Sequence, residues 1–312
     1  MKLGFVFPGQ GAQTLGMGKE LYDEYECVRN IYDKVKEITK IDIAKVTFEG
    51  TQEELNQTKM TQLSILTMSL GILEILKKEE IEAQISAGLS LGEYTALLYS
   101  RQITFEEGVQ IVKKRGEFMQ NNLPTGDWSM AAIIGLSDEE VKKVCEAITE
   151  FFVVPANYNC PGQVAISGEK EGVLLAMEKA KQVGAKRAIE LRTSGPFHTE
   201  KLKEASGLLK KELDNIKIQA PKGKIVIKNI DGTPYEMEDD IRQILADHVT
   251  HPVQFTKCIK TMLEMGVDTF VEIGPGKVLS GFIKKINKDI KVLHINDLES
   301  LKNTIIQVKE NC

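Results

Sequence analysis

The chain has 312 residues, of which 42% are hydrophobic and 27% are charged, and its formal net charge at pH 7 is −5. These values are those of an ordinary globular protein, with enough apolar residues for a sizeable core. The negative charge disfavours nucleic acid as a partner, because phosphate binding needs a basic excess. No stretch reaches the ~18 apolar residues of a membrane-spanning helix, so no membrane association is expected.

The cysteines indicate a reduced compartment. There are five, odd in number, far apart and without a CxxC pair: Cys27, Cys145, Cys160, Cys258 and Cys312. This pattern is typical of an intracellular protein. The N-terminal MKLGFVFPGQG meets glycine and proline before an apolar signal segment could form, so a cytoplasmic enzyme is predicted.

The N-terminal part predicts alternating strands and helices. LGFVF is a short apolar run that ends at Pro8-Gly9, as expected of a buried strand. A long apolar stripe predicts a helix over about 61–78. AQISAGLS then leads into a second helix, EYTALLYS. The segment 104–121 has helical periodicity and a Thr-x-x-Glu start that fits a capping box.

The segment 126–192 predicts a small inserted subdomain. After the connector LPTGDW, the patterns read strand, helix, strand, strand, helix, strand, which is the ferredoxin-like order. Alternating elements resume afterwards, with KIVIKNI, DTFVEIG and KVLHIN as strands. We therefore expect an α/β protein whose larger domain has a mainly parallel sheet and is built from residues 1–125 and 193–312.

The stretch GLSLG, residues 88–92, has the G-x-S-x-G pattern of a nucleophile elbow. Glycines on both sides of Ser90 would permit a tight strand-to-helix turn that exposes the hydroxyl. The flanks AQISA and EYTALL fit such a turn. A serine that only caps the next helix is the alternative, and the five residues alone leave it open.

A nucleophilic serine needs a base, and the chain has four histidines. His294 lies in a predicted strand, where a buried structural role is expected. His248 and His251 lie at a helix end, where capping is expected, and no third ligand completes a metal site. His198 follows Gly195-Pro196 on a loop between the two predicted domains, where it can face a cleft.

Several further motifs occur together in the chain, in order: FPGQGAQ, GLSLGEY, KRGEFM, NYNCPGQVAISG, PFH, HPVQFTK and EIGPGKVL. Over about residues 3 to 285 the sequence resembles the malonyl-CoA:acyl carrier protein transacylases, a family of fatty-acid and polyketide synthesis. The resemblance implies an α/β-hydrolase-like large domain with a ferredoxin-like small one, as the element order also predicts.

The resemblance implies three central roles. Ser90 is expected to be the nucleophile and His198 its general base. Arg115, in KKRGEFM, is expected to bind the free carboxylate of the malonyl group, for which a guanidinium offers a matching pair of donors. Taken without the resemblance, Arg115 would be read as a solvated residue of a charged helix face.

Further positions follow from the same resemblance. The backbone amides of Gln10 and Leu91 are expected to form an oxyanion hole, where one donor is typically worth ~3 kcal/mol. The backbone carbonyl of Gln254 is expected to hold the imidazole in place of a triad acid. Gln163 and Asn159 are expected to line the cleft. As isolated residues, these glutamines would be ordinary turn or strand-edge residues.

Two positions bear on acyl selectivity. The family usually has histidine just before the serine, where this chain has Leu89, and that position contacts the acyl group. The usual tryptophan after the PVQ stretch is Phe255 here. Phe197, in the PFH triplet, resembles the malonyl-selective relatives and is expected to exclude a 2-methyl substituent.

The predicted reaction is transfer of malonyl from malonyl-CoA to the phosphopantetheine thiol of holo acyl carrier protein, through malonyl-serine with ping-pong kinetics. No metal or cofactor is expected, and the protein is expected to be a monomer. Acidic carrier proteins need a basic surface, for which Lys186-Arg187 and Lys284-Lys285 are candidates. The alternatives are an acyltransferase of a polyketide synthase, a serine thioesterase or esterase that would favour His294 as base, and a subunit that only binds.

Overall fold

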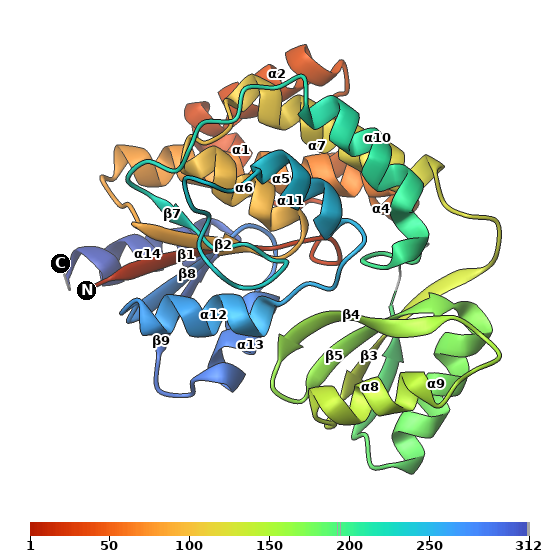
Figure 1. Cartoon of the computed structure of the whole chain (residues 1–312). Coiled ribbons are helices and arrows are strands. Elements are labelled where there is room, and N and C mark those ends of the chain that lie inside the picture. Colours follow the sequence, from red (N-terminus) through yellow and green to blue (C-terminus); the bar gives the residue numbers. More distant parts are fainter. Residues whose placement is uncertain (192, 194, 311–312) are drawn as a thin grey trace.

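The larger body is built on a five-stranded parallel sheet. A computed structural model describes residues 1–191, 193 and 195–310. The strands are β1 (Leu3–Phe7), β2 (Ile85–Gly88), β7 (Ile225–Val226), β8 (Thr269–Ile273) and β9 (Lys291–Ile295). They lie in the order β7-β2-β1-β8-β9 with parallel pairing throughout (Figure 1). The first and last parts of the chain thus share one sheet, as predicted.

Both faces of this sheet are covered by helices. Successive side chains of a strand point to opposite faces, so Phe5 and Phe7 of β1 join one apolar cluster and Val6 joins another. The first cluster draws on α2 (Glu26–Thr39), α5 (Thr58–Lys78), α6 (Leu91–Tyr99), α7 (Phe105–Asn121), α10 (Lys203–Leu213), α11 (Ile241–His248) and α14 (Leu298–Lys309). The second lies under α12 (Phe255–Glu264) and α13 (Val278–Ile286). Three short helices complete this body: α1 (Lys19–Glu24), α3 (Ile43–Phe48) and α4 (Gln52–Asn56).

Helix α5 is the core of the larger body. It is long and apolar enough to cross a membrane, and it is the one such helix within the described residues. However, 83% of its most apolar window is buried inside the protein. A helix that is apolar on all sides and enclosed by other helices is a core helix. Its C-terminal turn carries Lys77 and Lys78, which complement the helix dipole.

The smaller body is a four-stranded antiparallel sheet with two helices. Its elements follow in the order β3 (Trp128–Ile134), α8 (Asp138–Glu146), β4 (Val153–Cys160), β5 (Gln163–Glu169), α9 (Lys170–Gln182) and β6 (Arg187–Glu190). The strands lie in the order β4-β5-β3-β6. The predicted ferredoxin-like order is confirmed, and Ser137 starts α8 with a full capping box. The limits 126–192 stay a prediction, and Arg192 lies outside the described residues.

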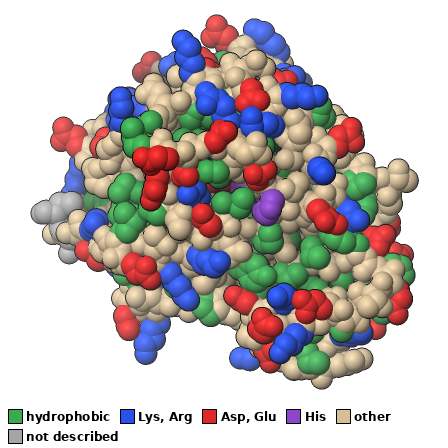
Figure 2. Space-filling view, in the orientation of Figure 1, with side chains coloured by type: hydrophobic (Ala, Val, Ile, Leu, Met, Phe, Trp, Pro, Cys, Tyr) green, Lys and Arg blue, Asp and Glu red, His purple; other side chains and the backbone are tan. Residues whose placement is uncertain are grey.

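The two bodies meet at β4, whose neighbours include a segment of the larger body. Asn157 of β4 forms a parallel bridge with Val253, just before α12. Figure 1 shows the small sheet below and to the right of the large one, and Figure 2 shows apolar side chains gathered along their junction. A cavity of about 530 Å³ lies at this junction.

The predicted strand KIVIKNI is shorter than expected. Only Ile225–Val226 form β7, because the chain then turns. Ile227 still donates its amide to the carbonyl of Ser86 on β2, but it also bridges Pro234, and the amide of Lys228 donates to the carbonyl of Thr233. The turn leaves Asn229 next to the carboxyl end of β2, where it contacts the serine turn described below.

Candidate active site

Ser90 stands on a strained turn between β2 and α6. Its φ of 55° and ψ of −101° lie where side chains are rarely found. The neighbours explain how the turn is tolerated. A Cβ on Gly88 would lie 1.8 Å from the carbonyl carbon of Gly92, and one on Gly92 would lie 2.1 Å from the oxygen of Phe7. Only glycine fits either position, so the motif folds as a nucleophile elbow does.

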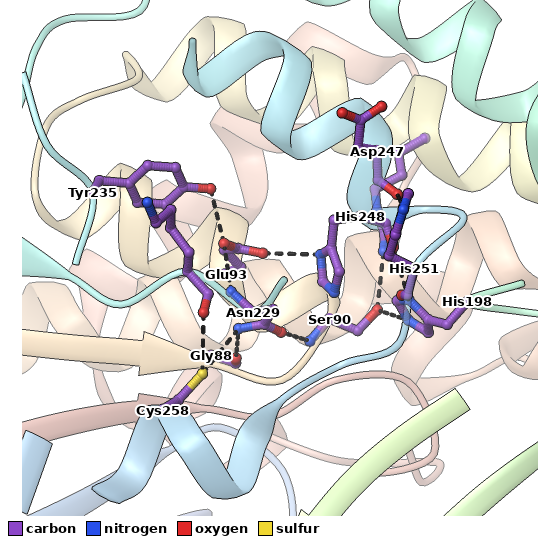
Figure 3. Close-up of polar contacts among 12 residues, drawn as sticks. Gly88, Ser90, Glu93, His198, Asn229, Tyr235, Asp247, His248, His251 and Cys258 are labelled. Carbon is purple, nitrogen blue, oxygen red and sulfur yellow. Dashed lines mark hydrogen bonds and ion pairs between the residues drawn. The ribbon is translucent and has the colours of Figure 1, made fainter. Parts of the chain in front are cut away.

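The hydroxyl of Ser90 lies between a histidine and an arginine. Its Oγ is 2.7 Å from Nε2 of His198 and accepts a hydrogen bond of 3.0 Å from Nη2 of Arg115. All three side chains are buried. Residues separated by up to 108 positions in the sequence are thus brought to one oxygen atom. Figure 3 shows the contact between Ser90 and His198.

His198 is oriented by two backbone carbonyls. Its Nδ1 lies 3.0 Å from the oxygen of His248 and 3.2 Å from that of His251. Carbonyls only accept, so Nδ1 carries the proton and Nε2 is left as an acceptor toward Ser90. These carbonyls are available because α11 ends at His248, and the last carbonyls of a helix have no intrahelical partner.

The environment of His198 keeps its imidazole neutral. Burial, the nearby His248 and the charge of Arg115 hold the pKa of His198 well below its usual value of 6.5. At neutral pH the ring can therefore take a proton from a hydroxyl 2.7 Å away.

Arg115 is buried rather than solvated. It is 1% exposed on α7, donates through Nη1 to Oε1 of Gln62 at 2.8 Å, and lies over the ring of Tyr94 at 5.3 Å. Burial lowers the pKa of Arg115 from its usual value, but an arginine stays charged in a protein. Its Nε has no hydrogen-bond partner among the described residues. A buried cation with an unused donor, beside a serine, is a site for an anion.

A cavity of about 530 Å³ opens at this serine. Five other residues predicted for the site line it together with Ser90 and His198: Gln10, Leu89, Asn159, Gln163 and Phe197. Its walls come from the loop after β1, from α13 and from β3, β4 and β5 of the small sheet. The cavity therefore lies between the two bodies.

The predicted oxyanion donors lie beside the serine. Gln10 follows β1 within Pro8–Gly11 and lines the cavity. Leu91 is the first residue of α6, where a backbone amide has no acceptor in a preceding turn. Gln10 and Leu91 thus follow the carboxyl ends of the neighbouring parallel strands β1 and β2.

The prediction for Gln254 needs correction. Its carbonyl accepts from the amide of Cys258 at 3.0 Å, and its own amide donates to the carbonyl of Asn229 at 2.8 Å. Gln254 is the N-cap of α12, so the first helical turn uses its carbonyl. The oxygens at His198 Nδ1 are those of His248 and His251 instead.

Three residues at the site, Gln62, Glu93 and Asn229, escaped the sequence analysis, and His248 was expected there only as a helix cap. Gln62 holds Arg115, and Asn229 accepts from the amide of Ser90 at 2.7 Å. Nδ1 of the His248 side chain lies 3.0 Å from Oε2 of Glu93 (Figure 3). Only Glu93 carried a usable signal, since it is a lone carboxylate within an apolar helical run, EYTALL.

Comparison with known proteins assigns the family. The acyl transferase domain model matches residues 4–301. A malonyl CoA-acyl carrier protein transacylase of Bacillus subtilis is 43% identical over 311 residues, which cover 99% of this chain and 98% of the relative. The chain belongs to the malonyl-CoA:acyl carrier protein transacylase family.

Solved structures of this family share the whole architecture. The malonyl CoA-acyl carrier protein transacylase of Clostridium perfringens is 45% identical, with a TM-score of 0.94 over 99% of this chain and 98% of that one. A malonyl transacylase solved with its type II polyketide acyl carrier protein is 34% identical, with a TM-score of 0.94 over 98% of this chain and 100% of that one. The predicted acyltransferase fold with two subdomains is confirmed.

Proposed function

We propose that this chain transfers a malonyl group from malonyl-CoA to the phosphopantetheine thiol of acyl carrier protein, in type II fatty-acid synthesis. The observation that carries the proposal is the position of Ser90 Oγ between His198 Nε2 and Arg115 Nη2, at 2.7 and 3.0 Å. The relatives described above are named for the same substrates.

In the first half-reaction Ser90 attacks the thioester carbonyl of malonyl-CoA. Its proton passes to Nε2 of His198 as the new C–O bond forms. The tetrahedral oxyanion accepts from the backbone amides of Gln10 and Leu91. When the C–S bond breaks, His198 returns the proton to the leaving thiolate, which gives CoA and malonyl-serine.

Arg115 selects for a carboxylate in the acyl group. In the free site Nη2 donates to Ser90, and Gln62 holds Nη1. A malonyl carboxylate can take the Nη2 and Nε donors, which pairs the buried charge. Phe197 and Leu89 line the same cavity and limit the room for a 2-methyl substituent.

The second half-reaction repeats these steps with a different thiol. His198 takes the proton of the phosphopantetheine thiol, the thiolate attacks malonyl-serine, and Ser90 recovers its proton as the C–O bond breaks. Both thioesters have similar energy, so the transfer runs in both directions with ping-pong kinetics. The chemistry uses no metal or cofactor, only a CoA thioester as substrate.

The carrier protein is expected at the mouth of the cavity. Of the two basic pairs considered, Lys284-Lys285 has a link to the site, since Lys285 Nζ donates to Oε1 of Gln163, a cavity residue, at 3.0 Å. Lys186-Arg187 lies at the start of β6 in the small sheet. We propose a cytoplasmic monomer without nucleic-acid or membrane partners.

A carrier of polyketide synthesis is the second candidate. One relative is described as the malonyl transacylase of a type II polyketide acyl carrier protein. The transfer chemistry is the same for either carrier. A thioesterase that uses His294 is disfavoured, because His294 lies on β9 and His198 is the histidine at Ser90.

Intact-protein mass spectrometry tests the proposal. Brief mixing with malonyl-CoA is expected to add one malonyl group to Ser90, and holo acyl carrier protein is expected to remove it. Ser90→Ala is expected to take up none, because no other hydroxyl is activated there. Labelling that persists in this variant rules Ser90 out. Loss of the label to water, at equal rates with and without carrier, shows a hydrolase instead.

A further inference from the structure

The steps above leave one fully buried carboxylate at the site unused. Glu93 lies on α6, three residues after Ser90, and is 0% exposed. Its Oε1 accepts from the backbone amide of Asn229 at 3.1 Å and from the hydroxyl of Tyr235 at 2.8 Å. A buried carboxylate is costly to desolvate, so its position demands such partners.

The second oxygen of Glu93 faces a single residue. Oε2 lies 3.0 Å from Nδ1 of His248, at ion-pair distance, and has no other partner within the described part of the chain. The side chain of His248 is 2% exposed, and its ring lies 4.9 Å from that of His198 at an angle of 34°. His248 is thus fixed from both sides (Figure 3).

The hydrogen bonds of Glu93 extend through Asn229 to the nucleophile Ser90. Asn229, held by Oε1 of Glu93 through its backbone amide, accepts from the amide of Ser90 at 2.7 Å through Oδ1. Its Nδ2 donates to the carbonyl of Gly88 at 2.6 Å. The Asn229 side chain therefore bonds to the backbone carbonyl of Gly88 and to the backbone amide of Ser90, and it supplies polar partners where the chain enters the strained serine turn.

The contact between Glu93 and His248 extends to the base His198. The carbonyl of His248 accepts from Nδ1 of His198 at 3.0 Å, while the His248 side chain contacts Glu93. Among the residues that the structure describes, Nδ1 of the base contacts no carboxylate, only the two neutral carbonyls of His248 and His251. The placement of these carbonyls then decides whether Nε2 is the acceptor toward Ser90.

We propose that Glu93 and His248 are positioning residues for the transfer reaction. Glu93 holds the end of α11 through the His248 side chain, and the His248 carbonyl in turn holds the imidazole of His198 in the tautomer that activates Ser90. The same carboxylate steadies the serine turn through Asn229. This inference rests on the proposed function, in which Ser90 and His198 act together.

A pair of substitutions at His248 separates positioning from simple packing. His248→Gln keeps a side-chain N–H for Glu93 and leaves the backbone unchanged. His248→Leu fills similar space without a donor and leaves Oε2 of Glu93 unpaired. We expect the Leu variant to lose at least about tenfold in the rate at which Ser90 reacts, since small displacements of reacting groups are costly, and the Gln variant to stay within about threefold.

The rate is read with a fluorophosphonate probe, which Ser90 attacks with loss of fluoride and which needs no malonyl recognition. Nitrogen NMR of His198 gives a second readout, because the Leu variant is expected to lose the single Nδ1–H tautomer. The affinity for malonyl-CoA is expected to change less than about twofold, because Arg115 is untouched. A Leu variant with the wild-type probe rate and tautomer overturns the inference.

Two further variants keep the test decisive. Ser206→Ala removes a hydrogen bond of 2.7 Å to the carbonyl of Ala246, on the same helix end, and is expected to keep the wild-type probe rate. If His248→Leu does not fold, Glu93→Gln takes its place with the same expected loss. A wild-type protein that reacts with the probe but takes up no malonyl contradicts the proposed function, while the comparison of variants still tests the positioning.

Discussion

At the scale of single residues, the proposed nucleophile and base both have an unusual positive φ. Ser90 has a φ of 55° and His198 a φ of 60°, and both belong to the small set of described non-glycine residues with positive φ. Each such residue costs on the order of 1–3 kcal/mol and persists only where its surroundings fix it. The carbonyls at His198 and the glycines around Ser90 provide that fixation.

The buried charge of Arg115 yields a selectivity prediction. Arg115→Ala is expected to lower kcat/KM for malonyl transfer by about 30-fold, because a charged hydrogen bond is worth about 2 kcal/mol. Acetyl transfer, which presents no carboxylate, is expected to change far less. Steady-state rates with malonyl-CoA and acetyl-CoA measure the difference. Equal losses of kcat/KM on both substrates would show that Arg115 supports the site without binding the malonyl carboxylate.

At the scale of elements, the elbow depends on a very close approach of α6 to β1. The backbone of Gly92 nearly touches the carbonyl of Phe7, so the first turn of α6 lies against the carboxyl end of the strand. This contact brings the amide of Leu91 close to the loop that carries Gln10. The spacing of the two glycines in the motif therefore sets the distance between the backbone amide of Leu91, which follows β2, and that of Gln10, which follows β1.

A matched pair of glycine substitutions tests this contact. Gly92→Ala would place a Cβ 2.1 Å from the Phe7 oxygen, and overpacking of this kind is expected to cost at least about 2 kcal/mol. Gly207→Ala, in α10 with no heavy atom within 4 Å of its Cβ position, is expected to stabilise the protein by up to about 1 kcal/mol. Urea unfolding of both variants measures the two changes. A Gly92→Ala protein as stable as the wild type would show that α6 can shift away from β1.

The end of α11 is the second decisive element. The last carbonyls of a helix have no partner within the helix. Here the carbonyl of His248, the last residue of α11, and that of His251 beyond it accept from Nδ1 of His198. The sequence predicted a helix end with capping histidines at this place. It could not show that a loop 50 residues earlier would supply the donor.

At the scale of the whole molecule, the candidate active site lies where two separately built bodies meet. The parallel sheet supplies Ser90 at its carboxyl edge, and the small antiparallel sheet supplies cavity walls. Burial shields His198 from water and lowers its pKa. Because the pKa of His198 then differs between the folded and the unfolded protein, the stability of the fold depends on pH.

That link predicts a pH dependence of stability. Below pH 6.5 the unfolded chain protonates His198 while the native protein does not, because the native pKa is well below this value. The contribution of His198 to the free energy of unfolding is therefore present at neutral pH. It is lost on acidification, at up to about 1.4 kcal/mol per pH unit for this one proton. The free energy of unfolding of the wild type, measured from pH 7 to pH 5, is expected to fall more steeply than that of His198→Ala. Parallel curves would place the folded pKa of His198 near its ordinary value.

The sequence predicted the element order because that information is local. Periodicity, capping and glycine-proline breaks predicted the ferredoxin-like insertion, the strands of the large sheet and the turn at Ser90. The motifs, taken together, indicated the family, which the comparisons confirm. The roles of the individual site residues stay predictions, although the structure brings Ser90, His198 and Arg115 into contact.

The tertiary structure decided what depends on burial and on contacts between distant segments. Arg115 in KKRGEFM reads as a surface residue, but packing of α7 against α5 encloses it and pairs it with Gln62. The hydrogen-bond partners of Nδ1 of His198 are backbone oxygens, which every residue has, so no side-chain pattern could single out His248 over Gln254. Desolvation and nonlocal backbone contacts have no local sequence signal, which is why the sequence determined the family and the elements, and the fold alone determined how the site is held.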